Sequence, residues 1–455
     1  MSRRRGPLVG LLAAELISLT GTRMSMVALP WFTLTTTGSA GRAGVVAFAE
    51  MLPYVLACGL GGPLLDRVGH RRASVSADVA SAAVLVAVPL LYHAGRLDFG
   101  LLVALIALVG LLRGFGETAK RVIFPDAVAV SGMALTRATA LHDGLGRLAT
   151  LLGAPLAGVL IAVLDAPTVL ALDAASFLLA GLVLVALVPA ALRPPADPAV
   201  VPARAAAGSA AVAPAGRLAG YLASLAEGLR FLLRDRLVRV VTVLLFVTNL
   251  ADAAYGAVLA PVWAREVVGS PAALGVLSAT FAVGAVLGNV VFTALAPRVP
   301  RFATFAVGFV LGGAPRYVAL ALVDRLWAVY LISFVAGLGL AAINPILGAL
   351  TYERIPAALR ARVLGLGHAI SWGGIPLGGL LAGLLTDSSS LVVAALVFGG
   401  AYLAVTAWPL LSPAWRQLDR PDGPNPATDL PVAQPHAGLP ADQEPLADGR
   451  TTAAR

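Results

Sequence analysis

The chain has little charge and almost no cysteine. Only 13% of its 455 residues are charged, whereas about a quarter are charged in a soluble domain of ordinary composition. The single cysteine, Cys58, lies inside an apolar run, which excludes an intramolecular disulfide and a cluster of cysteine ligands for a metal. The shortage of charge indicates that much of the chain is surrounded by lipid rather than by water.

Several patterns of catalytic and cofactor-binding proteins are also missing. The sequence has no His/Cys cluster with metal-ligand spacing, no glycine-rich phosphate loop of the Walker type and no plausible Ser-His-Asp set. We therefore expect no metal, no cofactor and no enzymatic activity, which leaves a membrane enzyme or receptor as a weak alternative. An ATP-driven pump is disfavoured because the chain contains no nucleotide-binding domain.

Long apolar runs are what the sequence has in place of charge. Hydrophobic residues make up 58% of the chain, in runs long enough for helices of about 20 residues, which a hydrocarbon core of about 30 Å requires. A membrane β-barrel would need short alternating segments, which are absent. The sequence predicts an all-α membrane protein with twelve transmembrane helices, at residues 8–34, 43–62, 74–94, 99–118, 136–161, 167–191, 238–262, 273–296, 303–322, 326–350, 363–386 and 390–411.

The runs divide into two groups of six. We expect a first half at 1–191, a cytoplasmic linker at 192–237, a second half at 238–411 and a disordered cytoplasmic tail at 412–455. The linker is rich in Ala and Pro and ends in a stretch with leucines at helical spacing, which is typical of an amphipathic helix on a membrane surface. The tail is rich in Pro, Ala and Asp and lacks apolar periodicity.

The basic residues are distributed unevenly about these spans. Four of the 33 basic residues lie in loops on the side away from the termini: Arg42, Arg96, Arg265 and Arg325. Another four lie inside predicted spans: Arg23, Arg113, Arg147 and Arg316. All the others, including Lys120 and Arg121, fall on the side that holds both termini. The positive-inside rule places that side in the cytoplasm. The net charge of +9 therefore reflects topology, and no nucleic-acid partner is expected.

The two halves also share a sequence repeat. A shift of 231 residues pairs Val27 with Val258, Pro30 with Pro261, Gly38 with Gly269, and Gly44 with Gly275. The first two spans therefore correspond to the seventh and eighth. This favours two parallel six-helix halves with a cavity at their interface.

A patterned set of charges follows the second span. The stretch reads Gly62-Pro63-Leu64-Leu65-Asp66-Arg67-Val68-Gly69-His70-Arg71-Arg72. Gly62 allows two helices to approach closely, and Gly69 permits a tight turn. Asp66 is placed to accept hydrogen bonds from Arg71 or from an exposed helix N-terminus. The alternative is a basic loop that only sets membrane orientation.

This G-x-x-x-D-R-x-G-x-R-R pattern resembles the loop signature of the major facilitator superfamily of secondary transporters. The runs Glu15–Met24, Ala28–Trp31 and Leu172–Phe177 resemble the macrolide-efflux and enterobactin-exporter branch, whose members are drug:proton antiporters. The resemblance implies a conformational latch that holds the halves together on the cytoplasmic side in the outward-open state. Its residues would be Gly62, Asp66, Arg67, Gly69, Arg71 and Arg72. The corresponding segment of the second half lacks the acid, so the latch is one-sided.

The fifth span contains a helix-breaking proline among small residues, which allows a kink and close packing. Its members are Gly144, Gly153, Pro155 and Gly158. The run from Gly153 to Gly158 resembles the glycine-proline motif of the superfamily's antiporters, although Ala154 stands where the family pattern has Gly. Generic helix packing is the alternative.

Ionisable residues inside the membrane are costly and mark functional sites by default. We rank the candidates for proton coupling as Glu50, Asp252, Glu15 and Asp143. A carboxyl group surrounded by apolar atoms holds its proton more tightly than one in water, which suits proton-coupled antiport. The in-membrane basic residues that need a role or a partner are Arg23, Arg113 and Arg147. The alternative for each acid is a structural ion pair, as Asp143 and Arg147 could form at i,i+4 spacing.

These features favour a secondary active transporter that exports amphiphilic, drug-like or macrolide-like molecules by alternating access, with coupling to proton influx. A proton-coupled importer on the same fold is the alternative. The sparse polar groups within the spans favour a lipophilic substrate. We expect a monomer in the lipid bilayer of the cell membrane, with a small-molecule substrate and the proton as its partners.

Overall fold

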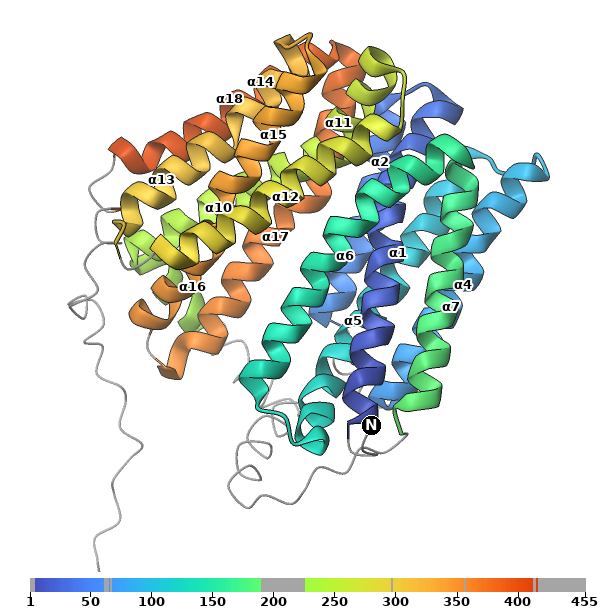
Figure 1. Cartoon of the computed structure of the whole chain (residues 1–455), viewed down its shortest axis with the longest axis horizontal. Helices are drawn as coiled ribbons and strands as arrows, with labels where there is room; N and C mark the ends of the chain where they lie inside the picture. Colours follow the sequence, from blue (N-terminus) through green and yellow to red (C-terminus); the bar gives the residue numbers. More distant parts are fainter. Residues whose placement is uncertain are drawn as a thin grey trace, which may run out of the picture. The chain divides into compact units, whose positions relative to one another are not determined.

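The chain folds into a bundle of membrane-spanning helices (Figure 1). A computed structural model describes residues 5–60, 65, 68–189, 226–295, 298–355, 357–411 and 415. The helices are α1 (Gly6–Thr37), α2 (Ala40–Leu60), α4 (His70–His93), α5 (Phe99–Ser131), α6 (Leu135–Val163), α7 (Ala166–Leu187), α10 (Arg236–Ala254), η1 (Tyr255–Leu259), α11 (Ala260–Trp263), η2 (Ala264–Val268), α12 (Ala272–Leu295), α13 (Arg301–Gly312), α14 (Ala314–Leu322), α15 (Leu326–Leu340), α16 (Ile343–Arg354), α17 (Ala357–Ser388) and α18 (Leu391–Leu411). They provide 12 segments long and apolar enough to cross a membrane, which confirms the predicted fold class.

Side-chain caps start several of these helices where the sequence turns back toward the membrane. Asp98 accepts a hydrogen bond from the amide of Leu101 at the start of α5. Asp165 does the same for Thr168 at the start of α7. Such caps satisfy amide groups that have no partner within the helix.

Helix α5 extends well beyond its predicted end. The sequence predicts a span ending at residue 118, but α5 continues to Ser131. Lys120, which we expected in a cytoplasmic loop, is instead buried and lies 2.9 Å from Asp78 of α4. Because the two charges neutralise each other, the bundle accommodates a lysine at this depth and the helix continues.

The two predicted halves are visible as separate groups in Figure 1, with α1 to α7 in blue to green and α10 to α18 in yellow-green to red. The groups converge at the end where α2 and α11 are labelled and separate toward the end that holds the N-terminus. At the convergent end α2 packs on α17, and α6 packs on α12. We refer to these as the closed end and the open end.

Glycines make the closed end possible. A Cβ atom added at Gly44 would lie 3.1 Å from the carbonyl carbon of Gly379, and one at Gly158 would lie 2.7 Å from the amide nitrogen of Gly275. The sequence repeat pairs Gly44 with Gly275, so corresponding glycines bring both pairs of helices together. Backbone contact at this distance leaves no room for a cavity between α2 and α17 or between α6 and α12 at the closed end.

The repeat is also evident in the helix ends. Gly38 ends α1 with φ +70°, and Gly269 ends η2 with φ +72°. A left-handed backbone at both positions favours glycine. The positions that the repeat pairs therefore end their helices in the same backbone conformation.

An acidic side chain also joins the halves at the closed end. Asp387, near the end of α17, accepts hydrogen bonds from the Ser39 hydroxyl at 2.6 Å and from the amides of Ala40 at 2.8 Å and Gly41 at 2.9 Å. Its carboxylate thus caps the N-terminus of α2, where the helix dipole favours negative charge. We call this contact the Asp387 cap.

The predicted latch lies near the other end of α2. Gly62, Asp66 and Arg67 are outside the described residues. Gly69 has φ +88° and immediately precedes α4, as expected for a turn glycine. Arg71 donates a hydrogen bond to the carbonyl oxygen of Val185 in α7 at 2.9 Å, within the same half, and Arg72 is exposed. The latch stays a prediction.

The segments between and after the halves are described only in part. Residues 190–225 of the predicted linker lie outside the described residues, whereas 226–234 are helical. Within that helix Phe231 is buried with Ile355 and Val363 of the second half. The predicted tail has a described residue, Trp415, which is fully buried beside Phe305 with ring centroids 5.3 Å apart. The second half therefore extends past the predicted boundary at 411, because an indole buries well against an aromatic ring.

The Asp387 cap makes the closed end sensitive to one charge. We expect Asp387→Asn to weaken the closed end by about 1 kcal/mol, a roughly fivefold population shift, because the amide loses one acceptor oxygen and the negative charge at the N-terminus of α2. Spin labels replacing Arg96 and Arg325, in a Cys58→Ala background, would report longer distances between the halves. Asp324→Asn, which changes an exposed acid, is the matched control. Unchanged distances in the Asp387 variant would contradict a role for the cap.

Candidate functional site

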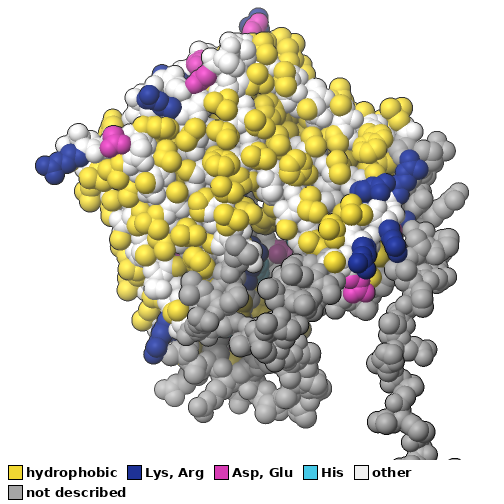
Figure 2. Space-filling view, turned by 180° about the vertical axis from the view of Figure 1, so that it is seen from behind, with side chains coloured by type: hydrophobic (Ala, Val, Ile, Leu, Met, Phe, Trp, Pro, Cys, Tyr) yellow, Lys and Arg dark blue, Asp and Glu magenta, His cyan; other side chains and the backbone are white. Residues whose placement is uncertain are grey.

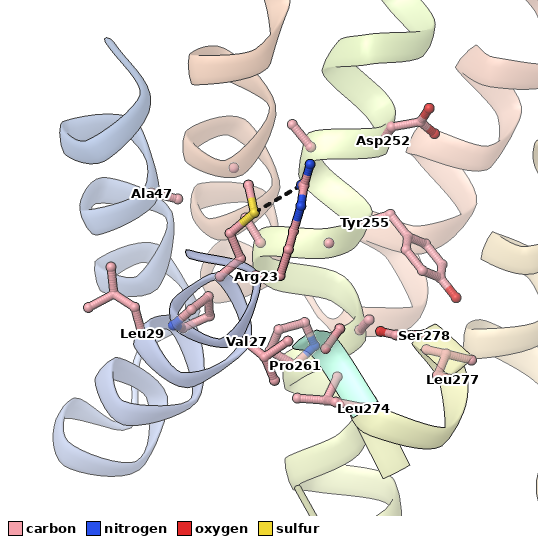
Figure 3. A pocket seen from close by; sticks show the side chains of 18 of the residues that line it. Arg23, Val27, Leu29, Ala47, Asp252, Tyr255, Pro261, Leu274, Leu277 and Ser278 are labelled. Atoms are coloured by element: carbon pink, nitrogen blue, oxygen red, sulfur yellow. Dashed lines mark hydrogen bonds between the residues drawn. The ribbon is translucent and has the colours of Figure 1, made fainter. Parts of the chain in front are cut away.

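A central cavity of about 370 Å³ lies between the two halves. Its walls come from α1, α2 and α6 on one side and from α10, η1, α12 and α14 on the other, and its lining is mainly apolar (Figure 3). Figure 2 shows a hollow in this face of the molecule, with hydrophobic side chains along its upper edge. The ionisable side chains in the lining are Arg23, Glu50, Asp252, Tyr255 and Arg316.

An ion pair in the first half anchors one wall. Glu50 of α2 is buried and bonds to Arg113 of α5. Glycines bring these helices together, since a Cβ at Gly110 would lie 2.9 Å from the carbonyl carbon of Glu50. The Arg113 guanidinium also lies over the Tyr54 ring, 5.7 Å from its centroid. Glu50 thus lines the cavity, and its charge is compensated by Arg113, which is not part of the cavity lining.

A second ion pair stands in the opposite wall. Asp252 of α10 bonds to Arg316 of α14, and their side chains are 41% and 8% exposed respectively. Four aromatic rings, those of Tyr255, Phe281, Tyr317 and Tyr402, lie within 4.8–5.8 Å of the Arg316 guanidinium. The rings stabilise the cation on its other faces. Tyr255 belongs to the π-helical segment η1, a kind of backbone that recurs at functional sites.

Arg23 of α1 has a different environment. Its Nη1 lies 3.4 Å from the sulfur of Met26, and its Nε is buried without a hydrogen-bond partner. No carboxylate of a described residue forms an ion pair with it. Thr22 precedes it and supplies no charge. An in-membrane arginine therefore lines the cavity without a direct ion pair to a described residue.

Further polar residues fill the interior of the first half. A small pocket of about 30 Å³, room for about one water molecule, is lined in part by Glu15, Asp78, Glu117 and Lys120. Lys120 pairs with Asp78, and Glu117 pairs with Arg121 at 2.5 Å. The sequence analysis missed Asp78, Glu117 and Lys120. Helical spacing in the sequence could have indicated Glu117 and Lys120, because Arg113, Glu117 and Lys120 follow one another at intervals of four and three residues on one face of α5.

The structure separates the four acids that were ranked for proton coupling. Glu50 and Asp252 line the central cavity, whereas Glu15 lines the small pocket and lies 2.7 Å from His142. Asp143 is 76% exposed, with its carboxylate 3.7 Å from His142.

The ion pair between Asp143 and Arg147, which was the structural alternative for Asp143, does not form. Arg147 is exposed on α6 and forms no ion pair with Asp143. The carboxylate instead turns toward the adjacent imidazole. Neither residue is part of the central cavity lining.

The glycines of the fifth span have separate contacts. Gly153 packs on α1, where an added Cβ would lie 2.9 Å from the Thr20 carbonyl oxygen. Gly158 and Pro155 pack on Gly275 across the interface between the halves. A Cβ at Gly144 would meet nothing within 4 Å, so close packing does not explain that glycine. The antiporter interpretation of this helix stays a prediction.

The buried Glu50–Arg113 pair makes a stability prediction. We expect Glu50→Gln to destabilise the protein by about 3 kcal/mol, because Arg113 is left as a buried charge without its partner. The double variant Glu50→Gln/Arg113→Gln should recover much of this loss. Thermal unfolding in detergent measures both, with the exposed Glu266→Gln as control. A double variant less stable than Glu50→Gln would contradict the argument.

Comparisons with known proteins agree with this arrangement. The model of the Major Facilitator Superfamily matches residues 11–255 and 241–441. The multidrug efflux pump Tap of Mycobacterium tuberculosis is 30% identical over 431 residues, 94% of this chain and 98% of that protein. The pump of the same name from Mycolicibacterium fortuitum is 27% identical over 91% of this chain and 98% of its own length. The crystal structure of the nucleoside transporter NupG shares the fold, with a TM-score of 0.68, 14% identity and coverage of 90% of this chain and 99% of that one.

Proposed function

Because this chain belongs to the major facilitator superfamily and is a multi-pass membrane transporter, we propose that it exports amphiphilic, drug-like molecules from the cell. The observation that carries the proposal is the central cavity between the halves. Its volume of about 370 Å³ lies in the range of sites for drug-sized ligands. Its apolar walls suit a lipophilic body, and its few charged groups suit a polar end.

The direction of transport is argued from two supports. Relatives that match nearly the full chain are named multidrug efflux pumps. The distribution of basic residues supports a cytoplasmic position for both termini, and with the N-terminus for the open end. In the described state the cavity then takes its substrate from the cytoplasmic side, while glycine contacts and the Asp387 cap close the outer side.

The proposal of alternating access rests on the packing of α2 against α17, because acids could join the halves at either end of this helix pair. Rocking the halves about the cavity would break the Asp387 cap and bring the cytoplasmic ends together. Asp66, which follows α2 in sequence, would then approach the N-terminus of α17 and act as the latch with Arg67 and Arg71. Each end of the helix pair would have one acidic capping residue, used in alternate states.

Proton coupling is proposed through Glu50, with Asp252 as the second candidate. Each acid lies at the cavity surface and pairs with an arginine. A proton arriving on Glu50 would cancel its charge and release Arg113, which changes both the electrostatics of the cavity and the packing of α2 on α5. Glu15 and Asp143 are weaker candidates because neither lines this cavity.

The test is accumulation of a macrolide and of a lipophilic dye in cells that express wild type or Glu50→Gln. We expect the wild type to lower accumulation several-fold. Both a protonophore and Glu50→Gln should abolish this effect, because each prevents the proton cycle. Glu266→Gln, with comparable expression, is the matched control.

The outcomes of this assay distinguish a wrong assignment of the proton carrier from a wrong direction of transport. If the protonophore abolishes export and Glu50→Gln does not, Asp252→Asn becomes the decisive variant and Glu50 is not the carrier. Higher accumulation in wild-type cells than in empty cells would contradict export and favour a proton-coupled importer.

A further inference from the structure

Arg23 gives the central cavity a cation that has no direct ion pair among the described residues. The two acids that line the same cavity, Glu50 and Asp252, already bond to other arginines. In Figure 3 the carboxylate of Asp252 points away from Arg23. The polar contact of the Arg23 guanidinium that the structure shows is with a thioether sulfur, a weak acceptor.

An arginine in this setting is unfavourable for the empty cavity. Arg23 is half-buried and its Nε is buried without a partner, so the cation loses part of its hydration without gaining a direct counter-ion. The neighbouring side chains, Met26, Val27 and Leu274, are apolar. Such a charge is stabilised when a ligand brings an anionic group, and the planar guanidinium binds the paired oxygens of an oxyanion through two parallel hydrogen bonds.

We propose that Arg23 binds the acidic group of an amphiphilic substrate, a carboxylate, sulfonate or phosphate, while the apolar body of that substrate lies against Val27, Pro261 and Leu274. The proposal deepens the export function and rests on it only in taking the central cavity as the substrate site. It assigns a charge preference to the site, toward anionic and zwitterionic amphiphiles over purely cationic ones.

The packing of α6 on α1 positions this side chain. A Cβ atom at Gly153 would lie 2.5 Å from the Cβ of Arg23, so the base of the side chain is held against the glycine. The rest of the Arg23 side chain lies in the lining of the central cavity (Figure 3). Gly153 acts as a positioning residue for Arg23.

A matched pair of fluorescent probes tests the proposal. Anilinonaphthalene sulfonate and phenylnaphthylamine share one aromatic body and differ by the sulfonate. Their binding to purified protein in lipid nanodiscs is measured by energy transfer from the protein's tryptophans, which excludes most of the signal from probe in lipid. We expect Arg23→Gln to weaken binding of the sulfonate about tenfold or more, and of the neutral probe by less than about twofold.

Two further variants define the role of the guanidinium. Arg23→Lys retains the charge without the planar fork, so its loss for the sulfonate should be intermediate. Arg147→Gln removes an exposed arginine of α6 outside the cavity and should change neither probe. Arg23→Gln should also raise the unfolding temperature of the ligand-free protein, because it removes an uncompensated charge. A purely structural role for Arg23 predicts the opposite shift.

Equal losses for both probes in Arg23→Gln, or no loss for either, would overturn the proposal. If Arg23→Gln does not fold, the affinities of the two probes are compared in Arg23→Lys instead. Wild-type affinity of Arg23→Lys for the sulfonate would mean that the planar guanidinium makes no specific contact, which would overturn the proposal. The efflux assay with a neutral lipophilic dye separates this result from the export function. Wild type that binds the sulfonate through Arg23 and exports no dye would refute export while supporting the site.

Discussion

Lipid provides no water for charged groups, and this constraint governs the arrangement of the bundle. Glu50 pairs with Arg113, Asp252 with Arg316 and Asp78 with Lys120, so most buried charges have a partner on a neighbouring helix. The pairs stand on both walls of the central cavity and inside the first half. They join neighbouring helices and include the acids proposed for proton coupling. Arg23 departs from this pattern, because no ion pair joins it to a carboxylate of the described residues.

The contact between α2 and α17 is the basis of the proposed two-state mechanism. Gly44 and Gly379 allow backbone contact at one end, where Asp387 also caps α2. Helix dipoles favour an acid at each N-terminus, so the antiparallel pair has two places where a single carboxylate can join the halves. In the proposed mechanism the halves move as six-helix groups, so engaging one cap requires releasing the other. The proposed substrate and proton sites, midway between the caps, would then be exposed to one side at a time.

Much of this fold follows from the sequence, because spans and repeats depend on long apolar runs and on glycines with required backbone geometry. Gly38 and Gly269 were paired by the repeat and end their helices in the same conformation. The partners of the in-membrane charges did not follow. Glu50 and Arg113 are 63 residues apart, so only helix packing brings them together. Lys120 was assigned to a loop because its neutralising partner, Asp78, lies on another helix. Asp387 was overlooked because the groups that donate hydrogen bonds to it belong to the opposite half.

Side-specific labelling of the cavity tests the account most directly. Thr150 lines the central cavity and is exposed, so Thr150→Cys in a Cys58→Ala background places one thiol there. A membrane-impermeant thiol reagent is then applied to right-side-out and to inverted vesicles. The account predicts fast reaction from the cytoplasmic face at rest, and new reaction from the outer face when substrate and a proton gradient drive turnover. Reaction from the outer face at rest, with protection from the cytoplasmic face, would contradict it.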